Sequence, residues 1–570
     1  MKNLHCILAA LLLISCSGGQ KAMRLTQADA LQNILPEGQI NMMPDGIVRV
    51  ARGENAVIQI VVDAADSLAG LVAEVDSRLP AETGWVHWVK SSLQYLPMDP
   101  KTVYSPDGLY PDPILTDVKE NVSAGGRAVL YVDIPVGRDV APGTYRGKVR
   151  ISGRAFGPDN SGKDVSASIR FTVKVYPATL PEQSLLVTNW YFPEKFHWMN
   201  EGLPVKKGSP EYWECLKSVI RTANDHGQNV WLLKEMGRAC VNADGSLAFD
   251  FTEMDRHIEF LLDNVNVQFI EADHIAKRSE NRWTDPFLVN VPAAAVNIPA
   301  GRGQSGDAVI PEAGIVRLAP EHSDTQRYIA SYFSALQEHL RSRRLPDGRT
   351  WLDIWLQHIG DEPIPENLAS WEAIAALVKK AAPEMKIIEA YRSPENKPGL
   401  IDVLVPQLDE IMQDGFRNIA EGQQCWFYTC MYPRGGFANR YVTQPLIKTR
   451  LLHWINYRFS LPGYLHWGFN YWGENGDPFG DVSAPLNDWP GGDSHIVYPG
   501  YRKVYPSIRL KAMRDGIRDY ELLRLAGSIT GQDFSAGTIT AFDQYDTSIE
   551  KFRELRRQLL ECVSESARRR

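Results

Sequence analysis

The sequence predicts an α/β protein: a (β/α)8 TIM-like barrel preceded by an all-β sandwich domain and followed by C-terminal helices. Three patterns predict this fold. Short alternating apolar runs occur up to residue 180, apolar runs alternate with helical spacing up to residue 500, and amphipathic stretches follow. The expected boundaries are residues 1–16 for a signal peptide with a lipobox, 21–180 for the sandwich, 185–500 for the barrel, and 501–570 for helices that pack on the barrel.

The first 16 residues have the pattern of a bacterial lipoprotein signal. Lys2 gives a positive start, and the apolar run Ile7–Ile14 is shorter than the roughly 20 residues that span a bilayer. The run ends in LISC, which resembles a lipobox and finishes at Cys16. We therefore expect cleavage before Cys16, lipidation of Cys16, and anchoring in the bacterial cell envelope, facing the periplasm or the surface. A plain signal peptide with an incidental cysteine is the alternative.

Residues 21–180 are expected to form a sandwich of short strands. Alternating runs bounded by Gly, Pro, Asp or Asn are typical of such domains. The runs are Ala56–Asp63, Leu71–Val75, Ala128–Ile134, Thr144–Ile151 and Ser168–Tyr176. This region shows no cluster of catalytic residue types. Pro177–Ser184 is expected to be a linker, because its prolines end the strand pattern.

From residue 185 onward, expected strands alternate with expected helices. The eight strands are Val187–Phe192, Asn229–Lys234, Val265–Glu271, Trp351–Ile359, Lys386–Tyr391, Asp402–Gln407, Cys425–Cys430 and Tyr464–Tyr471. The helices are Tyr212–His226, Phe251–Asn264, Thr325–Ser342, Glu366–Ala382 and Leu446–Phe459. This alternation predicts a (β/α)8 barrel, whose functional site lies at the carboxyl ends of the strands. The long segment Lys277–Pro320 follows the third strand and is expected on that face.

Two amphipathic stretches follow the expected barrel. They are Pro506–Leu525 and Thr547–Ser564. Their apolar residues recur at helical spacing, so we expect two helices that pack on the barrel. The basic residues at the very C-terminus are expected to be solvated.

Composition and charge exclude several classes of function. Lys and Arg number 61 and Asp and Glu 69, so the net charge of −8 argues against a general affinity for nucleic acid. Seven cysteines are present, and none forms a C-x-x-C pair typical of a zinc ribbon. The His residues lack H-E-x-x-H spacing, and no G-x-S-x-G or Walker A motif is present. Neither a metal nor a cofactor is expected.

The most informative local feature is the run QHIGDEP at residues 357–363. The apolar strand Trp351–Leu356 leads almost directly into Asp361 and Glu362. Gly360 lets the backbone bend, and the proline that follows the pair ends the strand, since it has no N–H to place in a sheet. In a barrel, both carboxyl groups would lie at the carboxyl end of the fourth strand. A solvated loop or a helix start is the alternative.

Adjacent carboxylates constrain the chemistry. Neighbouring Cα atoms are about 3.8 Å apart, whereas most glycosidases place two carboxyl groups about 5–5.5 Å or about 6.5–9.5 Å apart. Neighbours can share the work if the substrate supplies the nucleophile. One carboxyl then protonates the leaving oxygen, and the other holds a 2-acetamido group whose carbonyl attacks the anomeric carbon. Two close carboxylates also raise the proton affinity of one of them, which suits a general acid near neutral pH.

These features, together with two later segments, resemble glycoside hydrolase family 123. The segments are Tyr464–Asp481, with LHWGFNYWGENGDPFGD at its core, and Pro506–Leu523, PSIRLKAMRDGIRDYELL. The resemblance spans most of residues 21–530. It implies a retaining exo-β-N-acetylgalactosaminidase that removes terminal β-GalNAc from glycans or glycosphingolipids through an oxazolinium-type intermediate, without a metal or nucleotide. It also implies that Asp361 orients and stabilises the acetamido group, and that Glu362 is the general acid and then the general base.

Further substrate-binding residues are proposed from their position near the ends of the expected strands. Sugar sites need flat apolar faces and fixed hydrogen-bonding groups. The candidates are Asn189, Trp190, His274, Tyr391, Arg392, Gln407, Tyr428, Trp467, Asn470, Tyr471, Trp472, Trp489, Asp493 and His495. Among them, the hydroxyl groups of Tyr391, Tyr428 and Tyr471 are candidates to bind the acetamido oxygen. Core packing or an incidental surface position is the alternative for each residue.

Two other functions are kept as alternatives. A non-catalytic glycan-binding lipoprotein would use the barrel as a scaffold, since a fold does not fix function. The intact carboxylate pair argues against this alternative. A related hexosaminidase would prefer β-GlcNAc, which differs from β-GalNAc in the orientation of one hydroxyl. The expected partners are a glycan or glycolipid and, through Cys16, a membrane.

Overall fold

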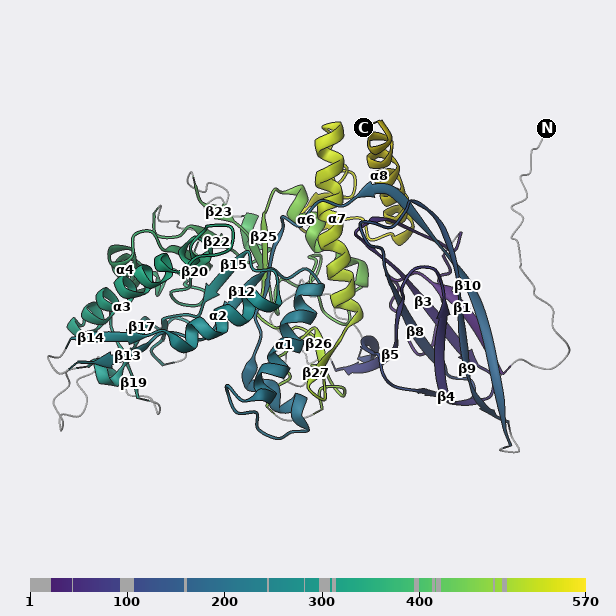
Figure 1. Ribbon diagram of the computed structural model, residues 1–570, viewed down its shortest axis with the longest axis horizontal. Coiled ribbons are helices and arrows are strands. Elements are labelled where there is room, and N and C mark those ends of the chain that lie inside the picture. The colour runs from purple at the N-terminus through teal and green to yellow at the C-terminus, as the bar shows by residue number, and fades with distance from the viewer. Residues whose placement is uncertain are drawn as a thin grey trace.

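The computed structural model describes residues 22–43, 45–92, 107–157, 161–242, 246–280, 282–296, 308–309, 314–393, 399–412, 416, 422–474, 477–483 and 490–569. The chain is a mixed α/β protein with several sheets. Figure 1 shows the long N-terminal strands on one side and the shorter strands with their helices on the other. The long helix α7 (Ile508–Thr530) stands between these two parts.

Two five-stranded sheets make up the N-terminal region. Their strands are β1 (Met23–Ala28), β2 (Ile47–Arg52), β3 (Asn55–Ala64), β4 (Ser67–Asp76), β5 (Glu82–Ser91), β6 (Gly108–Leu115), β7 (Glu120–Val122), β8 (Arg127–Pro135), β9 (Gly143–Phe156) and β10 (Gly162–Thr179). The strand orders are β1-β3-β8-β5-β6 and β2-β10-β9-β4-β7. Buried aliphatic side chains from both sheets, such as Ile58 of β3 and Ile151 of β9, form one core. The five strands expected from the sequence lie within β3, β4, β8, β9 and β10.

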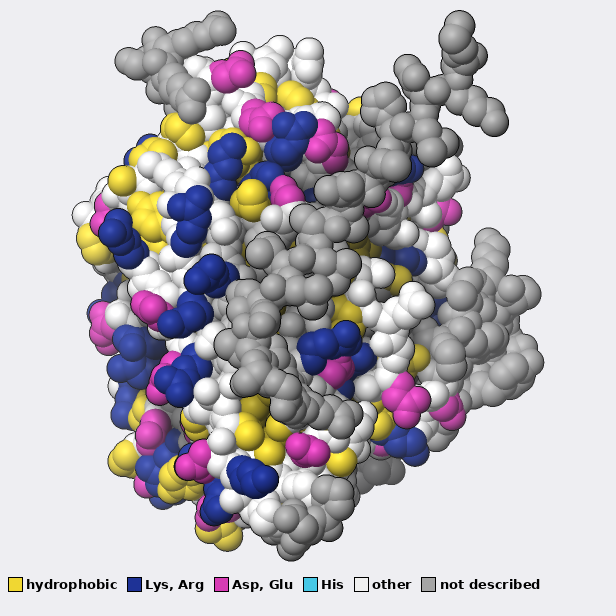
Figure 2. Space-filling model, turned by 90° about the vertical axis from the view of Figure 1, so that its right-hand side faces the viewer, with side chains coloured by type: hydrophobic (Ala, Val, Ile, Leu, Met, Phe, Trp, Pro, Cys, Tyr) yellow, Lys and Arg dark blue, Asp and Glu magenta, His cyan; other side chains and the backbone are white. Residues whose placement is uncertain are grey.

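The outward face of the second sheet is basic. Along β9, Arg146, Lys148 and Arg150 are exposed and alternate with buried residues. Arg170 of β10 lies directly opposite Lys148. Figure 2 shows Lys and Arg side chains gathered on this side of the molecule, with fewer acidic ones among them. On its other side β9 pairs with β4, where Asp76 lies opposite Lys148 and Glu74 lies opposite Arg150, so acidic side chains partly balance this cationic face.

The second region is built on short strands that pair in parallel and follow one another in chain order. They are β11 (Leu186–Asn189), β12 (Val230–Leu233), β15 (Phe269–Ala272), β20 (Trp355–Gln357), β21 (Lys386–Ala390), β22 (Val403–Val405), β23 (Gln424–Cys425), β24 (Phe427–Thr429) and β25 (Gly463–His466). One sheet has the order β12-β15-β20-β21-β22-β23, and another has the order β11-β25-β24. Their carboxyl ends carry the residues described below.

Backbone hydrogen bonds connect these two parallel sheets on both sides. The Asn229 N–H, just before β12, donates to the Val187 carbonyl of β11 at 3.1 Å. The Trp426 N–H, between β23 and β24, donates to the Leu404 carbonyl of β22 at 2.8 Å. Each of the eight strands expected from the sequence therefore corresponds to one position in this order, with β23 and β24 together forming the seventh.

Amphipathic helices separate several of these strands, close to the expected ranges. They are α1 (Pro210–Asp225), α2 (Thr252–Asn264), α3 (Ser323–Ser342), α4 (Leu368–Ala381) and α6 (Leu446–Arg458). The start of α1 shows the local cause. The Ser209 hydroxyl accepts a hydrogen bond from the Tyr212 N–H at 3.2 Å, and Pro210 occupies the first turn, where no N–H is needed. Cys215 and Val219 then fall on the buried face.

Two predicted features differ from the structure. The strand expected over Trp351–Ile359 is shorter, because Trp351–Ile354 forms a 3-10 turn (η3) that Thr350 and Asp353 cap reciprocally. The long segment Lys277–Pro320, for which no strand was predicted, contains most of a small antiparallel sheet. Its strands are short, and the Gly and Pro residues around them hide the strand pattern in the sequence. Its strands are β16 (Ala276–Arg278), β17 (Phe287–Pro292), β18 (Ala308–Val309) and β19 (Ile315–Leu318).

The C-terminal helices α7 and α8 (Ile549–Arg569) correspond to the two expected ones. The other short elements are β13 (Arg238–Val241), β14 (Leu247–Asp250), β26 (Val497–Gly500), β27 (Lys503–Pro506), β28 (Ile539–Ala541), β29 (Gln544–Tyr545), and the 3-10 turns η1 (Pro193–Asn200), η2 (Ala293–Ala295) and η4 (Glu410–Met412). Helix α7 also contacts the N-terminal sheets, since Lys511 and Arg514 pair with Asp133 of β8 at 2.7 and 2.6 Å. Among the residues that the structure describes, no helix combines the length and apolar character needed to cross a membrane.

Candidate active site

Asp361 and Glu362 lie just beyond the carboxyl end of β20. The Asp361 side chain is 51% exposed. Glu362 has a φ of 48°, a left-handed conformation that a residue with a side chain adopts only at a cost, often at functional sites. Gly360 is needed for a different reason from the one expected. A Cβ atom there would lie 2.7 Å from the Phe287 ring, so the glycine allows this close approach rather than a bend with positive φ.

Glu362 is partly enclosed and is held from two sides. The Tyr428 hydroxyl donates a hydrogen bond to Glu362 Oε1. Arg278 donates from Nη2 to the Glu362 carbonyl at 2.9 Å. Burial, and then the charge of Asp361, raise the pKa of Glu362 to about 7. A carboxyl group with this pKa can both give and take a proton near neutral pH.

Asp361 faces the imidazole ring of His274, which follows β15. His274 Nε2 lies 4.0 Å from Asp361 Oδ1 and 3.5 Å from Glu389 Oε1. Burial opposes the charged form of His274, but its interactions with Asp273 and Glu389 outweigh burial and raise the pKa of His274 well above its usual value. The exposed carboxylate of Asp361 therefore lies beside a cationic ring.

Glu389 of β21 holds the backbone that leads into the carboxylate pair. Its Oε2 atom accepts hydrogen bonds from the Ile359 N–H at 2.9 Å, the Gly360 N–H at 3.0 Å and the Trp371 indole N–H at 3.0 Å. Its Oε1 atom lies 3.1 Å from His358 Nδ1. Although burial raises the pKa of Glu389, the two histidines lower it to about 2. Glu389 is therefore ionised, and its hydrogen bonds fix the backbone turn before Asp361.

His274, His358 and Glu389 are also the only group of His and acidic side chains in the described part of the chain whose donor atoms are close enough for a metal ion, all within 4.8 Å. The contacts here favour a hydrogen-bonded network instead. Glu389 Oε1 faces both rings, Oε2 is occupied by three N–H groups, and His358 Nε2 lies 3.4 Å from Glu271 Oε2. Glu271 in turn accepts from the Trp190 indole N–H at 2.7 Å.

Gln407, which follows β22, and Cys430, which follows β24, lie on the side of the site beyond Tyr428. Gln407 Oε1 accepts from the Tyr428 hydroxyl at 3.3 Å and lies 4.0 Å from Cys430 Sγ. Burial, and then the charges of Asp493 and Glu362, raise the pKa of Cys430 well above its usual value. Cys430 is thus connected to Glu362 through Gln407 and Tyr428.

An aromatic wall of Phe192, Trp467 and Tyr471 stands at the ends of β11 and β25. The ring centroids of Phe192 and Tyr471 are 5.2 Å apart, and those of Trp467 and Tyr471 are 5.7 Å apart. The Nζ atoms of Lys195 and Lys234 lie 4.4 Å above the Tyr471 ring and 4.3 Å above the Phe192 ring. Each of the three rings is partly exposed, so this aromatic wall offers the apolar surface that sugar C–H groups need.

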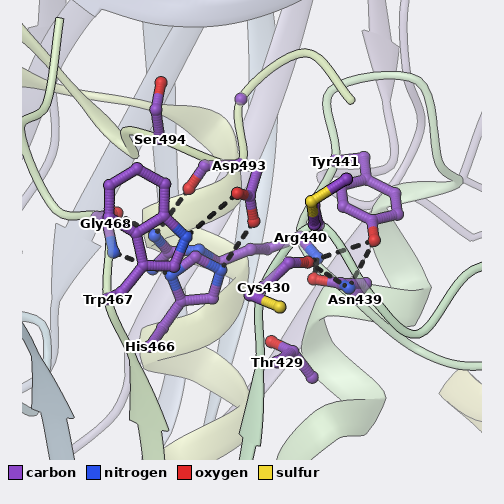
Figure 3. Close-up of polar contacts among 12 residues, drawn as sticks. Thr429, Cys430, Asn439, Arg440, Tyr441, His466, Trp467, Gly468, Asp493 and Ser494 are labelled. Atoms are coloured by element: carbon purple, nitrogen blue, oxygen red, sulfur yellow. Dashed lines mark hydrogen bonds and ion pairs between the residues drawn. The ribbon is translucent and has the colours of Figure 1, made fainter. Parts of the chain in front are cut away.

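Asp493 fixes the Trp467 ring, as Figure 3 shows. Asp493 Oδ2 accepts a hydrogen bond from the Trp467 indole N–H at 3.0 Å. His466 Nδ1 accepts a hydrogen bond from the Gly468 N–H at 3.0 Å. A neutral His466 ring therefore carries its proton on Nε2, and this atom lies 3.3 Å from Asp493 Oδ1. Burial raises the pKa of Asp493 to about 7. Arg440 lies beside this group and donates to the Gly468 carbonyl.

The structure brings part of the predicted site together. Arg392 pairs with Glu410 at 2.6 Å, and its positive charge acts to lower the pKa of Glu362. The other predicted residues in the connected groups described above are Asp361, Glu362, His274, Gln407, Tyr428, Trp467 and Tyr471. Trp489 and Cys16 lie outside the described residues.

Other predicted residues have mainly structural contacts. Asn189 accepts from Arg440 at 2.7 Å, and Asn470 accepts from the Phe192 N–H at 2.8 Å. Trp472 is buried and donates to the Val497 carbonyl at 2.8 Å. Tyr391 and His495 are fully buried, the first against Trp371 and Phe416 and the second against Tyr498. Without a rearrangement, none of these five buried side chains is accessible to a sugar.

Sequence reasoning missed Glu389, Glu271, His358 and Arg440. The signal for two of them was available, because Glu271 and Glu389 are acidic residues inside otherwise apolar strands, and a buried carboxylate requires partners.

Comparisons with known proteins agree with this geometry. The family model described as the glycoside hydrolase 123 catalytic domain matches residues 190–526, which include both adjacent carboxylates. The chain belongs to glycoside hydrolase family 123. A search of curated proteins finds no match to this sequence. Family membership supports a glycosidase, as the paired carboxylates independently suggest.

Solved structures support the same family at the level of the fold. A family 123 glycoside hydrolase from Clostridium perfringens is 14% identical and has a TM-score of 0.69, with 96% of this chain and 98% of that chain covered. A family 5 glycoside hydrolase from Bacteroides vulgatus is 10% identical, with a TM-score of 0.31, 60% of this chain and 68% of that chain covered. A family 5 mannosidase from Rhizomucor miehei is 11% identical, with a TM-score of 0.31, 60% of this chain and 94% of that chain covered. The last two are too distant to support any inference.

Proposed function

We propose that the chain is a retaining exo-β-N-acetylgalactosaminidase that removes terminal β-GalNAc from glycans or glycosphingolipids. The observation that carries the proposal is the adjacent pair at the end of β20. Asp361 is half-exposed beside the His274 ring, whereas Glu362 is enclosed and has a pKa raised to about 7. The family 123 relative from Clostridium perfringens hydrolyses glycolipid glycans, which supports a glycan terminus as the substrate.

Glu362 acts first as the general acid. With a pKa of about 7, a substantial fraction of the carboxyl is protonated at neutral pH, and it gives this proton to the glycosidic oxygen as the bond to C1 breaks. The Tyr428 hydroxyl keeps the carboxyl oriented. The carbonyl oxygen of the substrate's 2-acetamido group forms the new bond to C1. The products of this step are an oxazolinium ion and the released aglycone alcohol.

Asp361 stabilises the positive charge that develops on the acetamido nitrogen. Its carboxylate accepts the acetamido N–H, and Glu389 and His274 hold the turn and the side chain that present it. Water then attacks C1 from the side that the aglycone left, Glu362 takes the proton of the water, and the bond from C1 to the acetamido oxygen breaks. Two inversions at C1 leave the β configuration unchanged, and both catalytic groups return to their starting states.

The aromatic wall supplies the apolar contact for the sugar in this proposal. Trp467 and Tyr471 are partly exposed and are held by Asp493 and Phe192. Of the three tyrosines proposed to bind the acetamido oxygen, Tyr471 is partly exposed and is the strongest candidate. Tyr391 and Tyr428 are buried, and the Tyr428 hydroxyl already donates to Glu362.

The scaffold that we propose is the irregular (β/α)8 barrel predicted from the sequence, with the N-terminal sheets as a β-sandwich. The parallel order of β11 to β25 and the hydrogen bonds from Asn229 to Val187 and from Trp426 to Leu404 support a closed barrel. The shared core of the two N-terminal sheets supports the sandwich. The boundaries at residues 180, 185 and 500 are part of this proposal.

We also propose that the protein is lipidated at Cys16 and held in the bacterial cell envelope, where glycolipid ends are available as substrates. The lipobox-like sequence LISC supports this proposal. Strand β1 begins at Met23, so only a short tether separates the anchor from the first sheet. In the native host, Cys16→Ser should move the protein from the membrane fraction to the soluble fraction. An unchanged distribution contradicts anchoring at this residue.

The experiment that tests the activity compares aryl β-GalNAc, β-GlcNAc and β-galactose substrates. Wild type, Glu362→Gln and the matched control Glu366→Gln, an exposed carboxyl four residues further on, are assayed together. We expect release from β-GalNAc by wild type and the control, and a loss of at least about a thousandfold in Glu362→Gln. Preference for β-GlcNAc would favour the hexosaminidase alternative. Calorimetric binding of GalNAc-terminated glycans without release would favour the glycan-binding alternative.

A further inference from the structure

Arg509, at the start of α7, uses all five of its N–H donors. Two of them bind the Asp112 carboxylate of β6 in a bidentate arrangement: Nε donates to Oδ1 at 2.8 Å and Nη2 donates to Oδ2 at 2.7 Å. The other three donate to backbone carbonyls, from Nη1 to Arg440 at 2.7 Å and Gly492 at 2.8 Å, and from Nη2 to His495 at 3.0 Å. A guanidinium presents its five donors in one rigid plane. The orientation set by Asp112 therefore determines where the other three donors point.

This pair is enclosed at the boundary between the N-terminal sheets and the site. Asp112 is 0% exposed and Arg509 is 2% exposed. The Tyr498 hydroxyl also donates to Asp112 Oδ2 at 2.5 Å. The backbone is shaped around Arg509, because Gly492 has a φ of 85° and a Cβ atom there would lie 2.8 Å from the guanidinium carbon. A bidentate pair in such surroundings is strongly directional, and loss of either partner leaves a buried charge without its counter-ion.

Two of the three carbonyls that Arg509 holds, those of Gly492 and His495, lie on either side of Asp493 in the chain. Asp493 accepts the Trp467 indole N–H at 3.0 Å (Figure 3). The same stretch pairs with the backbone beyond Trp467, since the Tyr471 N–H donates to the Ser494 carbonyl at 3.1 Å. A continuous set of hydrogen bonds thus runs from β6 of the N-terminal sheets, through Arg509, to the aromatic wall.

We propose that Asp112 is a positioning residue for the sugar-binding aromatic wall. It orients Arg509, Arg509 fixes the carbonyls that flank Asp493, and Asp493 fixes the Trp467 ring. The N-terminal sheets are then a working part of the active site rather than an attached module. The kinetic consequence rests on the proposed glycosidase function, whereas the structural consequence does not.

Asp133 provides a matched control. It also belongs to the N-terminal sheets, is 2% exposed, and pairs with two basic residues of the same helix, Lys511 and Arg514. Arg514 bonds onward to Asp515 at 3.0 Å, within α7 rather than in the loop around Asp493. Asp133→Asn therefore removes a comparable buried charge pair without touching the carbonyls that Arg509 holds.

The test compares Asp112→Asn and Asp133→Asn in the chain that lacks only the predicted signal. Amide hydrogen exchange is measured for the peptide covering residues 490–497, and kcat and KM are measured with an aryl β-GalNAc well below both melting temperatures. For Asp112→Asn we expect exchange to accelerate about tenfold or more and KM to rise about tenfold, with a smaller change in kcat. For Asp133→Asn we expect both quantities to stay within about twofold, although the melting temperature falls.

Arg509→Lys is the second variant and carries the test if Asp112→Asn does not fold. Lysine keeps a cation for Asp112 but presents a flexible point charge that cannot hold three carbonyls in fixed positions, so the same two effects are expected. Equal acceleration of exchange in both Asn variants, or an unchanged KM in Asp112→Asn, overturns the proposal. If wild type releases nothing from any aryl glycoside, the proposed function fails, and the exchange comparison still decides this inference.

Discussion

The raised pKa of Glu362 should couple catalysis to stability. Folding moves this pKa from 4.5 to about 7, because burial and the charge of Asp361 disfavour the ionised form. The folded state therefore binds the proton more tightly than the unfolded chain. Its stabilising contribution is complete below about pH 4.5 and is lost as the pH rises towards 7. A shift of roughly 2.5 units corresponds to about 3 kcal/mol.

Glu362→Gln removes this titration but keeps an oxygen that can accept from the Tyr428 hydroxyl. An unfolding entropy of about 2.1 cal/mol/K per residue over 570 residues converts about 3 kcal/mol into about 2–3 °C. We expect scanning calorimetry to give nearly equal melting temperatures at pH 5 and a variant that melts about 2–3 °C higher at pH 8. Glu366→Gln reports the effect of removing an exposed carboxylate nearby. A difference of the same size at both pH values, or a less stable variant at pH 8, refutes the reasoning.

Three further predictions concern turnover of an aryl β-GalNAc. The kcat/KM of wild type should fall about tenfold per pH unit above about pH 7, as Glu362 loses its proton, and a flat pH–rate profile up to pH 9 contradicts the role of this group as the acid. His274→Gln removes the cation between Asp361 and Glu389, so kcat should fall about 10–100-fold with little change in KM. Initial rates that show a change in KM alone would argue against this role of His274. Trp467→Ala should raise KM about 3–10-fold through lost contact with the sugar, whereas an unchanged KM would remove Trp467 from the binding site.

Much of the fold could be predicted because the helices and buried strands carry strong periodic signals. The helix expected over Tyr212–His226 is observed as Pro210–Asp225, within two residues at each end. Strand β6 could not be found in this way. Its sequence GLYPDPIL contains two prolines and an aspartate, which argue against a strand when only local propensity is considered. The aspartate is Asp112, and its partner Arg509 lies almost 400 residues further along the chain.

The placement of the candidate residues was predicted best where their position near a strand end alone brings them together. Asp361 and Glu362 follow β20, Tyr428 lies one residue before the end of β24, and parallel strands bring their carboxyl ends to the same edge. Position in the sequence did not show that Tyr391 and Trp472 are buried whereas Tyr471 is partly exposed. The direction in which a side chain points decides whether it enters the core. Glu389 was missed for the opposite reason. It lies within β21, and its role depends on the turn after β20 folding over it.

Substrate assistance is the central claim, and it is tested most directly by changing the nucleophile in the substrate. The measurement is kcat/KM for aryl β-GalNAc substrates whose N-acetyl group carries no, one, two or three fluorine atoms. Each fluorine withdraws electrons from the carbonyl oxygen that attacks C1. We predict that the rate falls steeply with each fluorine and that the matching β-galactoside is nearly inert. Rates that do not depend on fluorine would mean that an enzyme residue is the nucleophile and would contradict the roles given to Asp361 and Glu362.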